Sequence, residues 1–437
     1  MREEPDRFPS VPSSRPPARD GLLLGLDIGT TRIKAVALDV AGIERAAASV
    51  ATPFSASADG VDMEVADLER ALAAAIGALG PFKDAAAAVG IAGMAESGAP
   101  VRGGRPAGPI VAWHDGRGEE TVASLGARFG SDLPRWTGRR LRTVSSVAKL
   151  GWQIEHGLPT PDRWLGVPEL ALFDLTGVEA TEHSLAARTG AYHVTDRAWL
   201  PEVTDHLGIP ARVFPEVRPA GSVMGSVSRE AARRFGLPAG VPVTVAGHDH
   251  LAAGVGLGAS ADDLLNSVGT AETVFRQVDA PPDVERALAL DLAVTLWPGG
   301  RSWAVLASAA RSGVVLGELA ASFGRSPEEL DRLAGSGSDA GRRWAAALDD
   351  LANRTMEAAA RVAELLGAHR RLIVFGGGSR SAPWLAAKAR VAGVPALRSG
   401  VAEAAARGAA LAGGAAAGWW PNTSDGPIPP LEAGCRA

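Results

Sequence analysis

Two short segments of the chain combine acidic or polar residues with a Gly-Thr turn between apolar runs. The first is Asp27-Ile28-Gly29-Thr30-Thr31, and the second is Asn266 to Glu272, which contains Gly269 and Thr270. Glycine lets the backbone approach an anion closely, while hydroxyl and N–H groups donate hydrogen bonds to phosphate oxygens. Asp27 is placed to hold Mg²⁺ through water, because this ion dehydrates reluctantly. Each segment alone fits an ordinary β-hairpin, but together they indicate two loops that close on the phosphates of one nucleotide.

A third segment, Gly376 to Ser381, follows the apolar run 372–375 and contains three consecutive glycines. Glycines between a strand and a helix let a flat ligand lie against the backbone, and the helix N-terminus favours negative charge. We therefore interpret Gly377, Gly378 and Ser379 as a nucleotide-binding surface. The chain contains no Walker motif, and a flexible strand–helix turn is the alternative interpretation.

A fourth segment places Asp249 between His248 and His250, directly after the apolar run 241–246. A carboxylate at a strand end can take the proton of a substrate hydroxyl while that oxygen attacks a phosphorus atom. A metal site formed by these three side chains is one alternative, and a surface loop with chance histidines is another. We favour a general base over a metal ligand.

The elements that must position these segments follow from apolar runs, helical spacing and turn residues. The first part of the chain predicts strands at 22–28, 33–38, 43–52 and 86–92 and a helix at 65–79. The second predicts strands at 241–246, 264–268, 273–277, 303–306 and 372–375 and helices at 381–392 and 401–417. The similarity of the two sets indicates two related α/β domains. We expect a disordered tail over 1–20, an N-terminal domain over 21–240, a C-terminal domain over 241–420 and a second tail over 421–437.

The composition excludes several classes of protein. The 437 residues carry 44 Lys+Arg and 49 Asp+Glu, and the net charge of −5 argues against a nucleic-acid-binding face. The single cysteine, Cys435, permits neither an intrachain disulfide nor a Cys-rich metal site. No apolar run approaches the roughly 18 residues of a membrane span, and the first 20 residues lack the apolar core of a secretory signal. We expect a cytoplasmic protein with no nucleic-acid or membrane partner.

The order of these motifs resembles that of the FGGY carbohydrate kinases, which belong to the group of sugar kinases, heat-shock proteins and actin. The segments that carry the resemblance are Leu26–Asp39, Trp113–Arg117, Gly247–Gly258, Ser267–Thr273, Phe375–Pro395 and Glu403–Gly418. The resemblance covers residues 21 to 418. It implies an α/β fold with two ribonuclease-H-like domains flanking a central cleft, ATP held mainly by the second domain and sugar mainly by the first.

The resemblance also implies a role for each matching residue. Asp27 would be the Mg²⁺-site aspartate, and Asp249 would be the general base. The phosphate and nucleotide contacts would come from Thr30, Thr31, Gly269, Thr270, Gly313, Gly377, Gly378 and Ser379. The chain departs from glycerol-kinase-like relatives at Ala382, where they carry an asparagine near adenine, so that contact is in question.

The substrate side matches the family less closely. Met94 and Glu96 lie where relatives place sugar contacts, but neither the Met-His pair of xylulose kinases nor the Arg-Glu pair of glycerol kinases is intact. A free Glu96 carboxylate would accept two hydroxyls and repel an acidic substrate. His250 is a further hydroxyl partner, and Trp113 is suited to stack on the apolar face of a sugar. We expect the substrate to be a neutral, ketopentose-sized sugar or polyol. Alternatively, Glu96 is only a charged loop residue and Trp113 only a core aromatic. A homodimer is left open.

Two other functions share parts of this pattern. An ATPase of the actin or heat-shock type would use both phosphate loops without a sugar pocket, and would have no reason to build the lining at Met94, Glu96, His248 and His250. A sugar-sensing protein that has lost kinase activity is the second alternative. Such a protein need not keep Asp27, Thr30 and Asp249 together, whereas this chain has all three.

Overall fold

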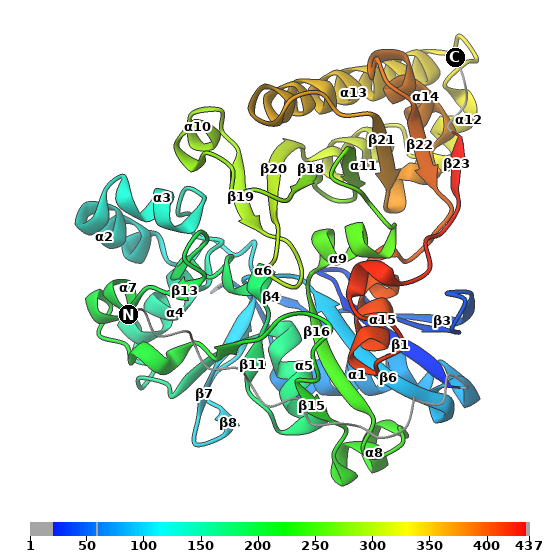
Figure 1. The fold of residues 1–437 in the computed structure, drawn as a ribbon. Helices are drawn as coiled ribbons and strands as arrows, with labels where there is room; N and C mark the ends of the chain where they lie inside the picture. Colours follow the sequence, from blue (N-terminus) through cyan, green and yellow to red (C-terminus); the bar gives the residue numbers. More distant parts are fainter. Residues whose placement is uncertain (1–20, 58–59, 434–437) are drawn as a thin grey trace, which may run out of the picture.

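A computed structural model of the chain describes residues 21–57 and 60–433. The expected tail over 1–20 lies outside these residues. The described chain forms a mixed α/β fold, as predicted, with one large sheet in the lower half of Figure 1 and another in the upper half.

The first large sheet begins with the predicted antiparallel strands. Strands β1 (Leu22–Ile28), β2 (Arg32–Leu38) and β3 (Glu44–Ala51) form a meander, and β6 (Ala86–Gly93) and β16 (Pro242–His248) extend it in parallel on the other side of β1. The strand order is β15-β16-β6-β1-β2-β3, with β15 (Gly225–Ser226) at the edge.

The second large sheet repeats this order. Its meander consists of β17 (Asp263–Val268), β18 (Glu272–Val278) and β20 (Trp303–Ala310), and β21 (Arg371–Phe375) and β22 (Ala396–Ser399) extend it in parallel. Strands β19 (Ala293–Leu296) and β23 (Leu431–Ala433) lie at the two edges. Each Gly-Thr turn therefore joins the first two strands of its sheet, and the two related units predicted from the sequence are confirmed.

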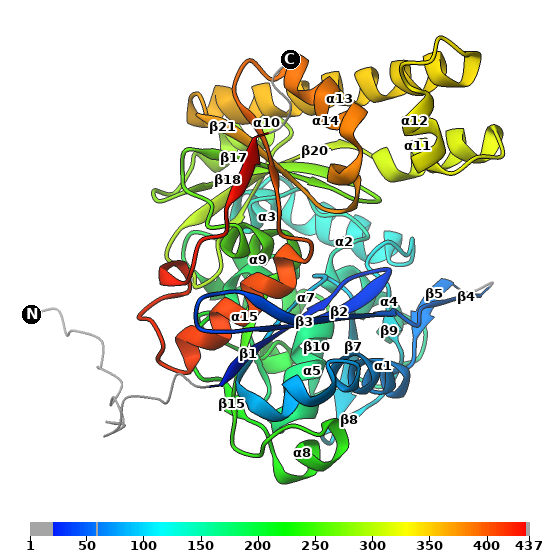
Figure 2. The same ribbon diagram turned by 90° about the vertical axis from the view of Figure 1, so that its right-hand side faces the viewer.

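Two helices form the layer between the sheets (Figure 2). Helix α15 (Ala404–Ala416) packs against β1, β6 and β16 of the first sheet, and against helix α9 (Asp249–Gly256). The apolar side chains of α9 pack in turn on Leu265, Phe275 and Ile373 of the second sheet. The outer face of the second sheet is covered by α13 (Asp339–Leu366) and α14 (Ala382–Val391).

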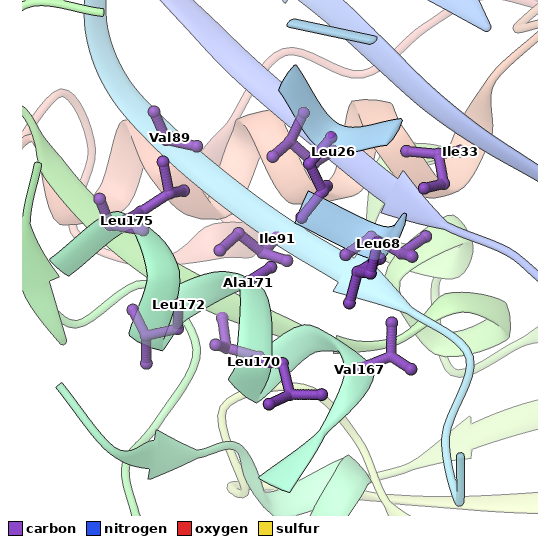
Figure 3. Close-up of a cluster of buried hydrophobic side chains, with 14 of the residues drawn as sticks. Leu26, Ile33, Leu68, Val89, Ile91, Val167, Leu170, Ala171, Leu172 and Leu175 are labelled. Carbon is purple, nitrogen blue, oxygen red and sulfur yellow. The ribbon is translucent and has the colours of Figure 1, made fainter. Parts of the chain in front are cut away.

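The largest core lies on the outer face of the first sheet, under helices α1 (Val65–Gly77) and α5 (Val167–Thr176). Figure 3 shows Leu26, Val89 and Ile91 from the strands on the side of α5 that carries Ala171 and Leu175. Burial of these apolar side chains is the main favourable term in folding. It also fixes the carboxyl ends of β1 and β16, where Asp27 and Asp249 lie.

The first sheet does not end at the predicted domain boundary near residue 240. Strand β16 lies after this point but pairs with β6, so the first sheet ends at His248. The last helix, α15, also returns to the first sheet. The expected tail over 421–437 contains a 3₁₀ turn at Thr423–Asp425 and the paired strand β23, and only its last four residues lie outside the described chain.

The remaining elements extend these two units. A smaller sheet contains β4 (Ser55–Ser57), β5 (Gly60–Met63), β7 (Gly98–Arg102), β8 (Arg105–Pro106), β9 (Ile110–Val111) and β10 (Arg163–Gly166). The segment before β16 contributes α2 (Glu119–Phe129), α3 (Asp132–Thr137), α4 (Ser146–Glu155), α6 (His183–Ala186), α7 (Pro201–His206) and α8 (Arg229–Phe235), and the second unit adds α10 (Val284–Ala289), α11 (Ser312–Ser322) and α12 (Pro327–Leu333). None of the helices in the described residues combines the length and hydrophobicity needed to cross a bilayer.

Gly25 is expected to be essential for the contact between β1 and α15. A Cβ atom at this position would lie 1.8 Å from the carbonyl oxygen of Ala406, which is rigid helix backbone. We expect Gly25→Ala to lower the free energy of unfolding by about 1–3 kcal/mol or more, and urea denaturation would measure this loss. Gly126→Ala in α2 is the control: its Cβ meets open space, so it should raise stability by up to about 1 kcal/mol. Equal effects of the two substitutions would contradict this packing.

Candidate active site

The first Gly-Thr turn is an open hairpin at the end of β1. Gly29 N donates to Arg32 O at 3.1 Å, and Thr52 Oγ1 donates to Gly29 O at 2.7 Å. Thr30 is half-buried and Thr31 is exposed. Trp113 Nε1 donates to Thr30 Oγ1 at 2.8 Å, so the tryptophan holds this turn, whether or not it also contacts a substrate.

Asp27 lies beside this turn in a setting that suits a divalent cation. Its side chain is buried, and Oδ1 has no hydrogen-bond partner within the described residues. Lys34 Nζ lies 3.7 Å from Asp27 Oδ2 and 2.7 Å from Glu403 Oε2. Burial raises the pKa of Asp27 to about 7, the charges of Asp249 and Glu403 add to this rise, and Lys34 opposes it. An orphan carboxylate oxygen with two further carboxylates nearby is a donor set that fits a hard cation.

Asp249 is the first residue of α9, at the end of β16. Its Oδ1 accepts a hydrogen bond from His250 N at 2.6 Å and lies 3.2 Å from His248 Nε2. Burial alone would raise its pKa, but His250, His248 and Lys34 outweigh burial and lower it. A carboxylate that stays ionised at neutral pH can accept a proton. Asp27 pairs with Ala92 of β6, and Ala92 pairs with Gly247 of β16, so the two aspartates lie at the same end of the first sheet.

The two histidines leave the metal-site alternative open. One ligand atom from each of His248, Asp249 and His250 lies within 4.8 Å of the others. Burial lowers the pKa of His248 to about 3, so its ring is neutral at physiological pH, and its Nδ1 has no partner within the described residues. A neutral His248 ring can donate a hydrogen bond through Nε2 to Asp249 or bind a metal ion, so it is compatible with Asp249 as a general base and with a metal site.

The strand end that carries Asp249 is held by a contact that the sequence analysis missed. Ser184 Oγ accepts from His248 N at 2.9 Å, and Glu182 Oε2 accepts from Ser184 N at 2.7 Å. Glu182 Oε1 accepts from Gly299 N, in the β19–β20 loop of the second sheet, at 2.8 Å. Gly247 has a φ of +108°, and a Cβ there would lie 2.3 Å from Ser184 Oγ. These hydrogen bonds join the segment that carries Asp249 to both units.

Glu96 is not a free carboxylate, which corrects the electrostatic expectation. Its Oε1 accepts from Arg139 Nη1 at 2.8 Å and from Arg188 Nε at 2.8 Å. Burial would raise its pKa, but the two guanidinium groups outweigh burial and lower it. Because two cations compensate its charge, Glu96 does not by itself repel an acidic substrate. Met94 is 2% exposed and packs in the core of the first unit, which is the structural alternative to a substrate contact.

Glu96→Gln is expected to be strongly destabilising. The substitution leaves the buried Arg139 and the half-buried Arg188 without their counter-charge, and Glu96 has a φ of +67°, so its backbone has little freedom to adjust. Breaking a buried ion pair costs about 3–5 kcal/mol, which chemical denaturation would measure. Glu357→Gln, at an exposed site on α13, is the matched control and should change stability by less than about 0.5 kcal/mol. If Glu96→Gln has the same denaturation midpoint as the parental protein, the ion pairs of Glu96 with the two arginines do not stabilise the fold.

The predicted nucleotide segments come together at one end of the second sheet. Gly313 N donates to Thr270 O at 3.2 Å, and a Cβ on Gly313 would lie 2.7 Å from Gly269 O. A Cβ on Gly378 would lie 2.4 Å from Val268 Cγ1, immediately before the second Gly-Thr turn. Gly269 and Thr270 are exposed. Ser379 is buried and donates to Gly376 O at 2.7 Å, so its hydroxyl stabilises the glycine turn.

The chain is similar to known proteins in sequence and in fold. The sequence model for the N-terminal domain of the FGGY family of carbohydrate kinases matches residues 22–256. L-fuculokinase from Escherichia coli (strain K12) is 28% identical over 342 residues, which cover 70% of this chain and 72% of the relative. L-fuculokinase from Salmonella typhi is 28% identical over 278 residues, which cover 59% of this chain and 57% of that protein.

The fold is also that of a solved sugar kinase. The xylulose kinase from Rhodospirillum rubrum superposes with a TM-score of 0.82 at 23% identity, covering 95% of this chain and 94% of that one. At this identity the likeness shows the fold, which consists of two actin-like ATPase domains.

Proposed function

The chain belongs to the FGGY family of carbohydrate kinases, and on this premise we propose that it transfers the γ-phosphoryl group of ATP to a hydroxyl of a neutral sugar or polyol. The observation that carries the proposal is that Asp27 and Asp249 lie at the same end of the first sheet, where β1, β6 and β16 end together. Its relatives named L-fuculokinase support a sugar as acceptor. We keep the ketopentose-sized acceptor as the preferred class.

Each group of the site has a defined task in this reaction. Asp249, kept ionised by its histidine neighbours, takes the proton of the acceptor hydroxyl as its oxygen attacks the phosphorus. Thr30, Thr31 and the Gly269–Thr270 turn donate hydrogen bonds to the phosphate oxygens. Asp27 would hold Mg²⁺, with Glu403 and Asp249 adding negative potential. When bound, Mg²⁺ neutralises charge that develops on the phosphoryl oxygens.

The acceptor side rests on a smaller set of groups. His250 lies next to Asp249 and donates its backbone N–H to that carboxylate, and Arg139 and Arg188 donate to Glu96. Arginine N–H groups donate to hydroxyl oxygens as well as to carboxylates. These groups suit a neutral acceptor but do not exclude an acidic one, so an aldonate is the informative competitor.

A substrate panel tests the proposed function. Ketopentoses, aldoses, tetritols, glycerol and one aldonate would be assayed for ADP release, and each would be tested by thermal shift with and without MgATP. We expect one neutral ketose or polyol to raise both Tm and ADP release, because a ligand that binds the native state stabilises it. ADP release that no acceptor changes would favour the actin-type ATPase. Sugar binding without any ADP release would favour the sugar-sensing protein, and preference for the aldonate would overturn the neutral class.

A further inference from the structure

A buried carboxylate behind the second Gly-Thr turn connects all three predicted nucleotide segments. Glu272, the first residue of β18, is fully buried. Its Oε1 accepts from Asn266 Nδ2 at 3.0 Å and from Thr355 Oγ1 at 2.6 Å, and it forms an ion pair with Lys388 Nζ. Its Oε2 accepts from Ser312 Oγ at 2.5 Å. Glu272 is thus bonded on both oxygens to four other elements of the second unit.

The partners of Glu272 lead directly to the groups expected to contact ATP. Ser312 begins α11 and precedes Gly313, whose N–H donates to Thr270 O. Lys388, which is 1% exposed, lies on α14, and its Nζ lies 5.0 Å from the centre of the Trp384 ring. That ring packs on the glycine turn, because a Cβ on Gly378 would lie 2.5 Å from Trp384 Cζ3.

This ion pair is poorly explained by stability alone. Two buried charges lose their hydration, and a buried pair is often no more stabilising than apolar side chains of the same size. Removing one partner, in contrast, leaves an uncompensated charge and is strongly destabilising. Fully satisfied buried polar networks hold their members in one arrangement. The value of the pair therefore lies in the geometry that it imposes on the turn before Glu272 and on the helix that carries Lys388.

We propose that Glu272 and Lys388 are positioning residues, whose buried pair holds the Gly269–Thr270 turn, Gly313 and the Gly377–Ser379 segment in the relative arrangement that binds ATP. The inference rests on the proposed kinase function but goes beyond it. Neither side chain touches the nucleotide, and both act through backbone segments. A displacement of about 1 Å in a positioned group can cost about 10²-fold in rate.

The same sheet offers a matched control pair. Asp263 and Arg371 are the first residues of β17 and β21, at the ends opposite to the Gly-Thr turn and the glycine turn. Arg371 Nε lies 2.5 Å from Asp263 Oδ1, and Arg371 Nη2 lies 3.0 Å from Asp263 Oδ2. Asp263→Asn therefore weakens an ion pair of the same sheet, between β17 and β21, without touching a nucleotide segment.

The test compares Glu272→Gln, Lys388→Met and the double variant with Asp263→Asn in the full chain. We expect each single variant to lower Tm and to raise the Kd for MgADP and the KM for ATP by about 10–100-fold, with the acceptor KM nearly unchanged. The charge-balanced double variant should recover much of the Tm while keeping the weak nucleotide affinity. Asp263→Asn should lower Tm and leave both nucleotide constants at the parental values.

Other results would overturn the inference. If Glu272→Gln binds MgADP with the parental affinity at a temperature where it is folded, the pair has only a structural role. The same conclusion would follow if the double variant recovered its MgADP affinity together with its Tm. If Glu272→Gln does not fold, the double variant and Lys388→Arg, which keeps the charge, supply the same comparison. Calorimetry measures MgADP binding without turnover. If the parental protein binds no adenine nucleotide in this measurement, the proposed kinase function fails, and not the role of the pair.

Discussion

Replacing Asp249 by Asn is expected to lower kcat by about 10²–10⁴-fold while leaving ATP affinity nearly unchanged. The amide keeps the shape of the side chain and can still accept from His250 N, but it cannot take up a proton. The lost contribution is that of a general base, which acts only as the acceptor hydroxyl attacks. The KM for ATP should therefore stay close to the parental value, and steady-state assays with the acceptor found in the panel would measure both constants.

Two controls separate this effect from loss of structure or of a metal. Asp350→Asn, at an exposed ion pair with Arg354 on α13, should leave kcat and Tm unchanged. The parental enzyme, treated with a chelator and returned to Mg²⁺ alone, should regain full activity if Asp249 is a base. Activity that returns only with a transition metal would instead support the His248, Asp249 and His250 metal site. Parental turnover in Asp249→Asn would remove the assignment of the base.

Short-range features of the site were predictable because local chemistry determines them. The turns at Gly29–Thr31 and Gly269–Ala271 lie between apolar runs that can only be buried as paired strands, and both are confirmed as the hairpins β1–β2 and β17–β18. The glycine turn after β21 was predictable for the same reason, since a strand and a helix must be joined there. These predictions needed a window of a few residues.

Long-range pairing was not predictable from such windows. The apolar run at 241–246 is compatible with either sheet, and only parallel pairing with β6 assigns it to the first. Glu96 lies 43 residues from Arg139 and 92 residues from Arg188 in the sequence, so nothing near it showed that its charge is compensated. The same is true of Glu182 with Gly299 and of Glu272 with Lys388.

The two sheets explain why acidic groups converge on Asp27. In the first unit the fifth strand in the shared order, β16, is followed by Asp249 at the start of α9. In the second unit the equivalent strand, β22, is followed by Glu403 at the start of α15. Since α9 and α15 pack together between the sheets, both carboxylates reach the end of β1. Glu403 could have been found in the sequence by applying the repeat to the aspartate that follows β16.

Asp27→Asn is the second substitution expected to have a large effect, and it should remove activity without reducing stability. A cation at this site contributes several kcal/mol to stabilisation of the phosphoryl transition state, so kcat/KM for MgATP should fall by about 10²–10³-fold. The side chain of Asp27 has an orphan oxygen and a pKa raised by burial to about 7. The ionised Asp27 carboxylate therefore lowers the stability of the folded protein, because burial removes its hydration. The neutral amide of Asn does not lose stability in this way.

The pH dependence of stability gives this prediction its control. A carboxyl whose folded pKa is raised contributes stability at low pH that is lost as pH rises through the folded value, here between about pH 4 and pH 7. The Tm of Asp27→Asn should therefore equal or exceed that of the parent at pH 8, and the difference should shrink toward pH 4. MgATP should stabilise the parent more than ATP alone and should give the variant no such increment. A variant that melts well below the parent at pH 8, or that keeps the Mg²⁺ increment, would show that Asp27 is a structural partner of Lys34 rather than the residue that holds the cation.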